Sequence, residues 1–307
     1  DIAITPVRAG GLDDPVVLSA TRALGVRDMA MYGSYAVCTT VDGVAILRMP
    51  QGDLQRLLNS LRNIEIIDCT PLVVDLRLVK SPAEVEKISY VCEAASLAFE
   101  DLPSWATSGE SEREIVRRFR IELLERGCDS TPYVIAGSGP GGYESIIMGP
   151  GDRVLERGDV LIIDTGATFD GYFCDFDRNF AFVSADDEVK RAYEVVWQAT
   201  EAGLAAARPG ATAEDLFYAM ATVLEEGGAV GNDVGRLGHG LGMNLTEWPS
   251  NRAGDRTPLR SGMVVTLEPG MLFAPGRMMV HEEDILITES APKLLTRRAT
   301  PDLPIIS

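Results

Sequence analysis

This sequence is poor in histidine and in basic residues, and it has no long apolar run. Only two histidines occur among 307 residues, and 28 Lys and Arg face 46 Asp and Glu, which gives a formal net charge of −18. Nucleic acids and anionic membranes both demand clustered basic side chains, so neither is expected as the main partner. No apolar run approaches the roughly 20 residues that cross a bilayer, and the first residues do not resemble a signal peptide.

Paired cysteines are also missing. The five cysteines are widely spread and none belongs to a CxxC pair, which argues against a disulfide framework and a zinc-thiolate site. A reducing compartment is therefore expected, and we place the protein in the cytoplasm. The acidity has two interpretations: a solvated surface, or several carboxylates that are buried for a purpose.

Local patterns predict two domains, residues 1–79 and 80–307. The first has strand-like segments at 31–41 and 44–49 and a helical spacing at 53–61, and it is expected to be a partial α/β domain. In the second, capping boxes at Ser81/Glu84 and Ser111/Glu114 begin two helices, the latter ending at Gly127, and further helices are expected at 188–207 and 212–226. Pairs of strands between the helices predict an α+β domain, with helices on one face of a mostly antiparallel sheet.

Apolar strands in the second domain deliver acidic residues. Segment 160–163 leads to Asp164, 171–174 leads to Asp175 and Asp177, and 263–267 leads to Glu268. Glu283 lies inside an apolar run at 279–288, where alternation puts it on one side with His281 and puts Glu282 and Asp284 on the other. Charges on both faces of such a strand are costly without partners.

Turn capping explains one or two of these acids, because Asp164 and Glu268 precede glycine turns. It does not explain all of them. Two divalent cations would neutralise four buried carboxylates, and His239, in the glycine-rich segment 238–242, would add a neutral nitrogen ligand. The sequence therefore favours a dinuclear metal site used for hydrolysis.

Residues 77–296 resemble the pita-bread metallopeptidase family M24, which includes methionine aminopeptidase, Xaa-Pro peptidases and creatinase. The family's metal ligands match in order and context; they are Asp164, Asp175, His239, Glu268 and Glu283. The resemblance implies a pita-bread catalytic domain after a smaller creatinase/prolidase-like domain. It also implies a homodimer.

By the same resemblance, Asp175 and Glu283 bridge two divalent ions (Mn, Zn, Co or Fe, with manganese as the working assignment), and Glu268 is the candidate proton shuttle. The chain departs from the peptidases on the substrate side, where a family histidine is replaced by Thr246 and segment 145–148 contains no histidine. Asp177 and His281 also replace usual residues. They either form an ion pair or orient the ligands, and the sequence leaves both open.

The expected activity is hydrolysis of an amide C–N bond in a short peptide or other small molecule. Thr246 and His281 are candidate catalytic residues beside Glu268, and Asp177 and three aromatic residues are candidates for contacting the substrate: Tyr143, Tyr172 and Trp248. The alternative is a creatinase-like or ectoine-hydrolase-like enzyme, with or without metal. A dimethylsulfoniopropionate lyase is disfavoured because Gly166 stands where an Asp is expected, and intact ligands disfavour a non-catalytic binding module.

Overall fold

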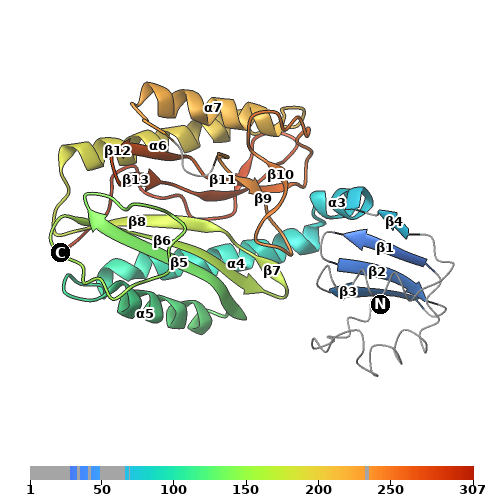
Figure 1. Ribbon diagram of the computed structural model, residues 1–307, viewed down its shortest axis with the longest axis horizontal. Helices are drawn as coiled ribbons and strands as arrows, with labels where there is room; N and C mark the ends of the chain where they lie inside the picture. The colour runs from blue at the N-terminus through green and yellow to red at the C-terminus, as the bar shows by residue number, and fades with distance from the viewer. Residues whose placement is uncertain (1–27, 33–34, 41–42, 49–65, 69, 232–234) are drawn as a thin grey trace. The chain divides into compact units, whose positions relative to one another are not determined.

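The computed structural model describes residues 28–32, 35–40, 43–48, 66–68, 70–231 and 235–307 (Figure 1). The chain divides into two compact units, Asp1–Arg77 and Leu78–Ser307. This boundary lies within two residues of the one expected from the sequence. The kinship of the first unit with creatinase/prolidase-like domains stays a prediction.

The first unit contains a four-stranded sheet in the order β3-β2-β1-β4. Its strands are β1 (Asp28–Tyr32), β2 (Tyr35–Thr40), β3 (Gly43–Arg48) and β4 (Ile66–Asp68), and helix α3 (Thr70–Leu78) follows. The single strand expected at 31–41 is wrong, because β1 and β2 form an antiparallel pair there. The helix expected at 53–61 lies outside the described residues.

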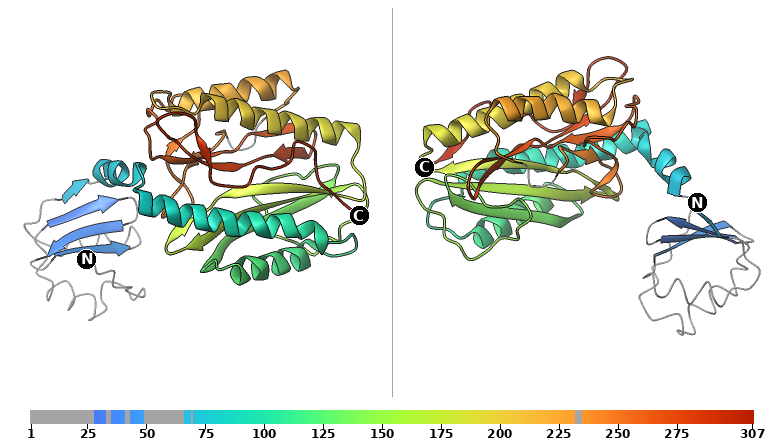
Figure 2. Two further views of the ribbon diagram at one scale, coloured as in Figure 1. Left: turned by 180° about the vertical axis from the view of Figure 1, so that it is seen from behind. Right: turned by 45° about the horizontal axis from the view of Figure 1, so that its top comes forward.

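The second unit contains one sheet in the order β16-β8-β6-β5, with the short β7 also paired to β6. Strands β5 (Ser130–Pro140), β6 (Asp159–Phe169) and β8 (Phe176–Phe182) are antiparallel, and β16 (Ile305–Ile306) runs parallel to β8. Helices α4 (Pro82–Asp101) and α5 (Glu112–Glu125) cover this sheet, as Figure 2 shows. Phe99 packs against Phe119 and Phe176 in the core between them.

A second five-stranded sheet has the order β10-β9-β11-β14-β15. Its strands are β10 (Glu247–Ser250), β9 (His239–Gly240), β11 (Val264–Leu267), β14 (Glu283–Leu286) and β15 (Lys293–Leu294). The hairpin of β12 (Gly270–Ala274) and β13 (Arg277–Val280) accompanies it. Helices α6 (Asp187–Ala206) and α7 (Ala213–Glu226) pack over this half (Figure 2). The described part of the domain therefore has two five-stranded sheets, each with its own pair of helices, besides the β12-β13 hairpin, where the sequence suggested one sheet.

The helix boundaries follow local sequence signals. Ser81 with Glu84 and Ser111 with Glu114 form reciprocal capping boxes at the starts of α4 and α5, as expected. Gly127 has φ +93° just beyond the end of α5, a backbone conformation that favours glycine. None of the described helices is both long and apolar enough to span a membrane.

Two expected strands are interrupted where the acidic residues lie. The run at 171–176 divides into β7 (Tyr172–Phe173) and β8, so Asp175 lies between strands rather than within one. The run at 279–288 is broken at His281 and Glu282, between β13 and β14. Alternation of apolar and polar residues alone does not reveal such breaks, because buried carboxylates can interrupt ladder pairing without changing the apolar pattern.

The two sheets are joined where β8 meets the segment before β14. The Asn179 side-chain amide donates to the Val280 carbonyl at 2.6 Å, and Arg178 Nη1 donates to the Glu282 carbonyl at 2.9 Å. These contacts fix the backbone around Glu282 against β8. The junction brings acids from the two sheets together.

Candidate metal centre

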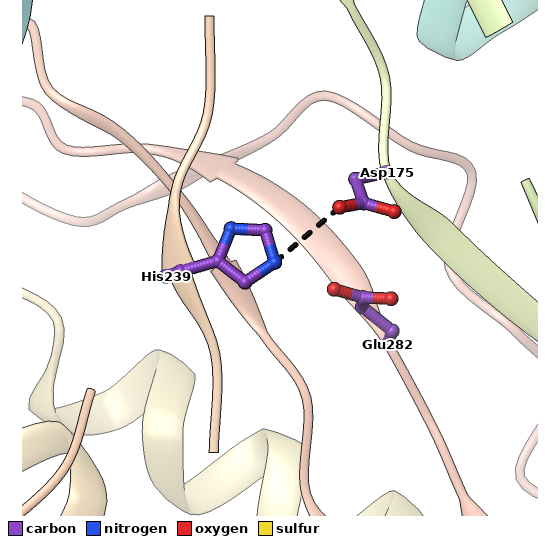
Figure 3. A group of neighbouring side chains, drawn as sticks. All are labelled: Asp175, His239 and Glu282. Atoms are coloured by element: carbon purple, nitrogen blue, oxygen red, sulfur yellow. Dashed lines mark ion pairs between the residues drawn. The ribbon is translucent and has the colours of Figure 1, made fainter. Parts of the chain in front are cut away.

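Three side chains from different elements converge at this junction. Ligand atoms of Asp175, His239 and Glu282 all lie within 4.8 Å of one another, and all three residues are buried. Figure 3 shows these side chains pointing toward one another, with His239 Nε2 3.3 Å from Asp175 Oδ2. One nitrogen and two carboxylates at such spacing form a candidate site for a divalent cation.

The surroundings of His239 favour its neutral form, with Nε2 available as a ligand atom. Its Nδ1 lies 2.9 Å from the Gly240 carbonyl oxygen, which fixes the proton on Nδ1 and leaves Nε2 as an acceptor. Burial, reinforced by the charge of Arg236, lowers the pKa of His239 to about 4. Gly238 is required next to it because its φ is +123° and a Cβ there would lie 2.2 Å from the Thr266 carbonyl oxygen.

Asp164 and Glu268 approach the same group. Asp164, on β6, pairs with Asp177 of β8 across the ladder. Glu268 follows β11, in which Leu267 pairs with Glu283, so continuing that antiparallel register by one residue places Glu268 opposite Glu282. Glu268 keeps part of its side chain exposed although its Oε2 atom is buried, which puts it toward the open side of the group.

Crowding of these acids disfavours their ionised forms. Burial raises the pKa of Asp164 to about 7 despite hydrogen bonds from Tyr133 and the Thr165 backbone. Burial and the charge of Asp164 raise the pKa of Glu268 to about 8. The pKa values of Asp175 and Glu282 are raised by burial first and then by neighbouring carboxylates. The nearby charge of Arg236 lowers the pKa values of Asp175 and Glu268, but it does not offset the effect of burial and of the neighbouring carboxylates.

A cation fits the donors that are present. Asp164 Oδ1, Glu268 Oε2 and Glu282 Oε1 are buried and have no hydrogen-bond partner in the described part of the chain. Unsatisfied buried carboxylate oxygens are costly, so three within one group call for an explanation. Four carboxylates and one neutral imidazole form an N/O donor set suited to Mn, Zn, Co or Fe.

Glu283 does not join this group, contrary to the expectation from the sequence. Its carboxylate accepts hydrogen bonds from Arg178 Nη2 at 2.9 Å, Arg298 Nη1 at 3.1 Å and the Ala299 backbone at 3.0 Å, and also from the Thr296 hydroxyl. Burial alone would raise its pKa, but Arg178, His281 and Arg298 lower it to about 2. Glu282 and Glu283 do point to opposite sides, as alternation predicts, but the residue that faces the candidate metal site is Glu282 and not Glu283.

His281 faces away from the group together with Glu283. Its Nδ1 lies 2.9 Å from the Thr200 hydroxyl, and Arg298 Nη1 lies 2.9 Å from its Nε2. The alternative of an ion pair with Asp177 is wrong among the described residues, because the acid beside His281 is Glu283 at 3.5 Å. Since its ring nitrogens are occupied and 1% of the residue is exposed, His281 has no route to a substrate.

Two further candidates are also occupied by internal contacts. The Tyr143 hydroxyl donates to Asn179 Oδ1 at 2.9 Å and accepts from the Val280 backbone at 2.7 Å, and the residue is buried. Asp177 is buried and lies 3.4 Å from the Asn179 amide nitrogen. Both support the junction between the sheets, and neither lines an open surface.

Thr246, Trp248 and Tyr172 keep exposed surface. Thr246 is exposed, and Trp248 is half exposed at the start of a cis peptide bond to Pro249. The Tyr172 hydroxyl donates to Glu84 Oε1 at 2.9 Å. Thr246 and Trp248 therefore remain candidates for substrate contact, whereas Tyr172 is held toward the start of α4.

Three residues near the group were missed from the sequence: Glu282, Tyr133 and Arg236. Tyr133 donates a hydrogen bond to Asp164, and burial together with the charges of Asp164, Asp175 and Glu282 raises its pKa well above the usual range. Alternation offered Glu282 and Glu283 as equivalent choices. Tyr133 was missed because it comes from a segment distant in sequence from the acids. Arg236 lies three residues before His239, but no pattern singled it out.

Comparison with known proteins identifies the family of this chain. Residues 86–289 match the model of metallopeptidase family M24. The chain is 32% identical to the Xaa-Pro dipeptidase of Pyrococcus furiosus over 232 residues, which cover 74% of this chain and 65% of that protein. It is 31% identical to the Xaa-Pro dipeptidase of Pyrococcus horikoshii, over 81% of this chain and 71% of that protein. The chain thus spans about two thirds of the length of these relatives.

Solved structures of peptidases share the fold of this chain. The prolidase from Pyrococcus horikoshii OT3 superposes with a TM-score of 0.80 at 29% identity, covering 92% of this chain and 77% of that one. Dipeptidase PepE from Mycobacterium ulcerans gives a TM-score of 0.78 at 28% identity, covering 84% and 69%. The expected α+β pita-bread fold is confirmed, and the named relatives are peptidases, a class of hydrolase. This chain therefore belongs to metallopeptidase family M24.

Proposed function

We propose that this protein is a metal-dependent hydrolase that cleaves an amide C–N bond. Two divalent cations, with manganese as the first to test, would be held by Asp164, Asp175, His239, Glu268 and Glu282. The observation that carries the proposal is the set of three buried carboxylate oxygens that have no hydrogen-bond partner among the described residues, beside the Nε2 atom of a neutral histidine. Two cations would offset the charge of the four carboxylates.

The chain's own residues supply the proton chemistry. When bound, divalent cations would polarise the scissile carbonyl and make an attacking water more acidic. Glu268 is the residue of the group with exposed surface, and its Oε2 is free to accept a proton from that water. The same atom can return the proton to the leaving nitrogen, so that water and amide become a carboxylic acid and an amine.

The direct test combines metal content with activity. Protein purified without chelator is expected to contain near two divalent ions per chain and to hydrolyse Xaa-Pro dipeptides. Asp175→Ala and His239→Ala are expected to lose metal and activity, whereas Asp152→Ala, on an exposed acid outside the group, is expected to keep both. Full hydrolysis by both variants, or by metal-free protein, would contradict the metal mechanism.

A second candidate is hydrolysis of a small amide or cyclic amino-acid derivative. Its basis is the side of the site where substrate would bind: Thr246 is exposed there, and no histidine other than the ligand His239 reaches the group in the described part of the chain. Thr246 offers a hydrogen bond but cannot act as an acid or base near neutral pH. Parallel assays on Xaa-Pro dipeptides, ectoine and creatine with metal-loaded protein separate the two candidates. Ligand binding without turnover of any of them would favour a binding module.

The remaining assignments are also proposals. A homodimer is supported by the family resemblance, and light scattering tests it. A cytoplasmic location is supported by Cys92, Cys128 and Cys174, which are buried free thiols. Leu245 and Tyr133 occupy the space in front of Gly166, where a Cβ would lie 2.3 Å and 3.1 Å from their nearest atoms. This crowding speaks further against an extra acid there and against the lyase.

A further inference from the structure

A buried ion pair lies close to the candidate metal centre and involves none of its proposed ligands. Lys80 Nζ lies 3.1 Å from Glu247 Oε2, and 2% and 4% of the two side chains are exposed. Lys80 precedes the cap of α4, and Glu247 begins β10, where it pairs with Gly240 next to His239. Lysine and glutamate are almost never so buried unless they are paired, so removing one charge leaves the other buried and poorly compensated.

The Glu247 carboxylate also closes the loop that carries Thr246. We call residues 241–246, between β9 and β10, the Thr246 loop. The Asn244 backbone N–H donates to Glu247 Oε1 at 3.1 Å, so one oxygen binds the loop and the other binds the lysine. Gly242 leaves room for this arrangement, because a Cβ there would lie 2.7 Å from Glu247 Oε2. The carboxylate therefore links the conformation of the loop to the start of α4.

Two further contacts complete a junction of three segments, which are the start of α4, β7 and the Thr246 loop. The Phe173 backbone N–H donates to the Gly242 carbonyl oxygen at 2.8 Å, which joins β7 to the loop. The Tyr172 hydroxyl donates to Glu84 Oε1 at 2.9 Å, which joins β7 to α4. Asp175 follows two residues after the end of β7, so the junction ties the loop to the segment of a proposed metal ligand.

The Thr246 loop itself buries little. No side chain from Met243 to Thr246 is buried, and 50% of Trp248, just beyond the loop, is exposed. A segment with few buried side chains opens easily unless polar contacts at its base hold it. The hydrogen bond to Glu247 and the ion pair behind it supply such contacts.

We propose that the Lys80–Glu247 pair positions the Thr246 loop and thereby presents Thr246 and Trp248 to the substrate. Lys80 and Glu247 are positioning residues, which act through the loop and take no part in proton transfer. This inference rests on the proposed function, because the substrate must lie at the metal centre for the loop to contact it. Without the pair, the loop samples other conformations, and substrate binding weakens while the metal ligands stay in place.

Hydrogen exchange measures the loop directly and does not need activity. Lys80→Met keeps the length of the side chain but leaves Glu247 without its cation. In metal-loaded, full-length protein the Asn244 amide is then expected to exchange at least about tenfold faster than in wild type, the loss expected for one hydrogen bond to a charged group.

The double variant Lys80→Met/Glu247→Met separates positioning from stability. It leaves no charge of the pair behind, and replacing a buried ion pair by apolar side chains of similar volume is often neutral for stability. It also removes the oxygen that binds Asn244. Exchange at that amide is therefore expected to stay fast although the melting temperature returns to near the wild-type value. If exchange and KM also return to wild-type values, the pair only stabilises the fold and the proposal is wrong.

Kinetics on the dipeptide Ala-Pro test the link to substrate. Both variants are expected to raise KM at least about tenfold and to change kcat less than about threefold, because substrate binding is lost equally in the ground and transition states. Arg113→Met is the matched control, since it breaks an exposed ion pair with Asp152; it is expected to leave both constants and the exchange rate unchanged. A lower kcat with an unchanged KM would mean that the pair acts on the metal centre, and would overturn the proposal.

Metal titration separates this inference from the proposed function. Both variants are expected to bind as many divalent ions as wild type. If wild type hydrolyses no Xaa-Pro dipeptide, the proposed peptidase activity fails, and exchange at the Asn244 amide still decides about the loop. Faster exchange in both variants supports its positioning by the ion pair, and wild-type exchange in both overturns it.

Discussion

Glu282 and Glu283 are neighbours in sequence, and the structure assigns them opposite roles that one pair of substitutions distinguishes. Glu283 is buried and ionised between Arg178 and Arg298. Glu282 is buried beside Asp175 and His239, and its pKa is raised. Glu283→Gln is therefore expected to destabilise the protein, and Glu282→Gln is expected to weaken metal binding with little loss of stability in the metal-free protein.

The size of the effect follows from the contacts. Removing one partner of a buried ion pair costs about 3–5 kcal/mol, because the remaining charge stays buried. In Glu283→Gln, Arg178 loses its carboxylate partner and Arg298 keeps only its pair with Glu201. A side-chain amide can replace only part of the hydrogen bonding. For a domain of this size, about 3 kcal/mol lowers the melting temperature by roughly 6–12 °C. Glu282→Gln removes one of several like charges, so its metal-free form should melt within about 2 °C of wild type.

Thermal unfolding with and without Mn²⁺ measures both effects. Wild type and the exposed control Glu289→Gln are expected to gain stability on adding metal, as ligand binding to the native state requires. Glu282→Gln is expected to lose most of that gain. Glu283→Gln is expected to show the full gain, but its metal-free form melts at a lower temperature than metal-free wild type. The opposite result would contradict these assignments: Glu283→Gln melts at the wild-type temperature but gains no stability from Mn²⁺, while Glu282→Gln gains as much as wild type.

Two further predictions follow from the charges at the site. The pKa values of Asp164 and Glu268 are raised to about 7 and about 8 from ordinary values of 3.8 and 4.5, so the stability linked to them is present below about pH 4 and is lost as the pH rises through 7 to 8. Metal-free protein is thus expected to melt at a higher temperature at pH 5.5 than at pH 8, and saturating metal should reduce that difference; a melting temperature that rises over this range in the metal-free protein would count against it. Tyr133→Phe removes the hydrogen bond to Asp164 and is expected to weaken metal affinity about tenfold to a hundredfold by calorimetry, unlike Tyr90→Phe on an exposed tyrosine.

Local sequence signals were enough to predict the helices of the second domain and the kinds of metal ligand. Ser81, Ser111 and Thr212 cap their helices through residues three positions away, so these boundaries depend on local contacts that the sequence displays. Asp164 and Glu268 were recognisable because each follows an apolar run of residues, and His239 because glycines surround it. Such signals depend on neighbours along the chain and do not need the fold.

Which of the two adjacent glutamates faces the candidate metal centre depends on tertiary contacts. Alternation separates Glu282 from Glu283, but a strand has no intrinsic inner face until other elements cover it. Arg178 from β8 and Arg298 donate hydrogen bonds to the Glu283 carboxylate. The register of β11 with β14 brings Glu282 opposite Glu268. Tyr133 reaches the site in the same way, because β5 pairs with β6, which carries Asp164. Burial of charge is settled by partners in space, and those partners appear only once the two sheets have met.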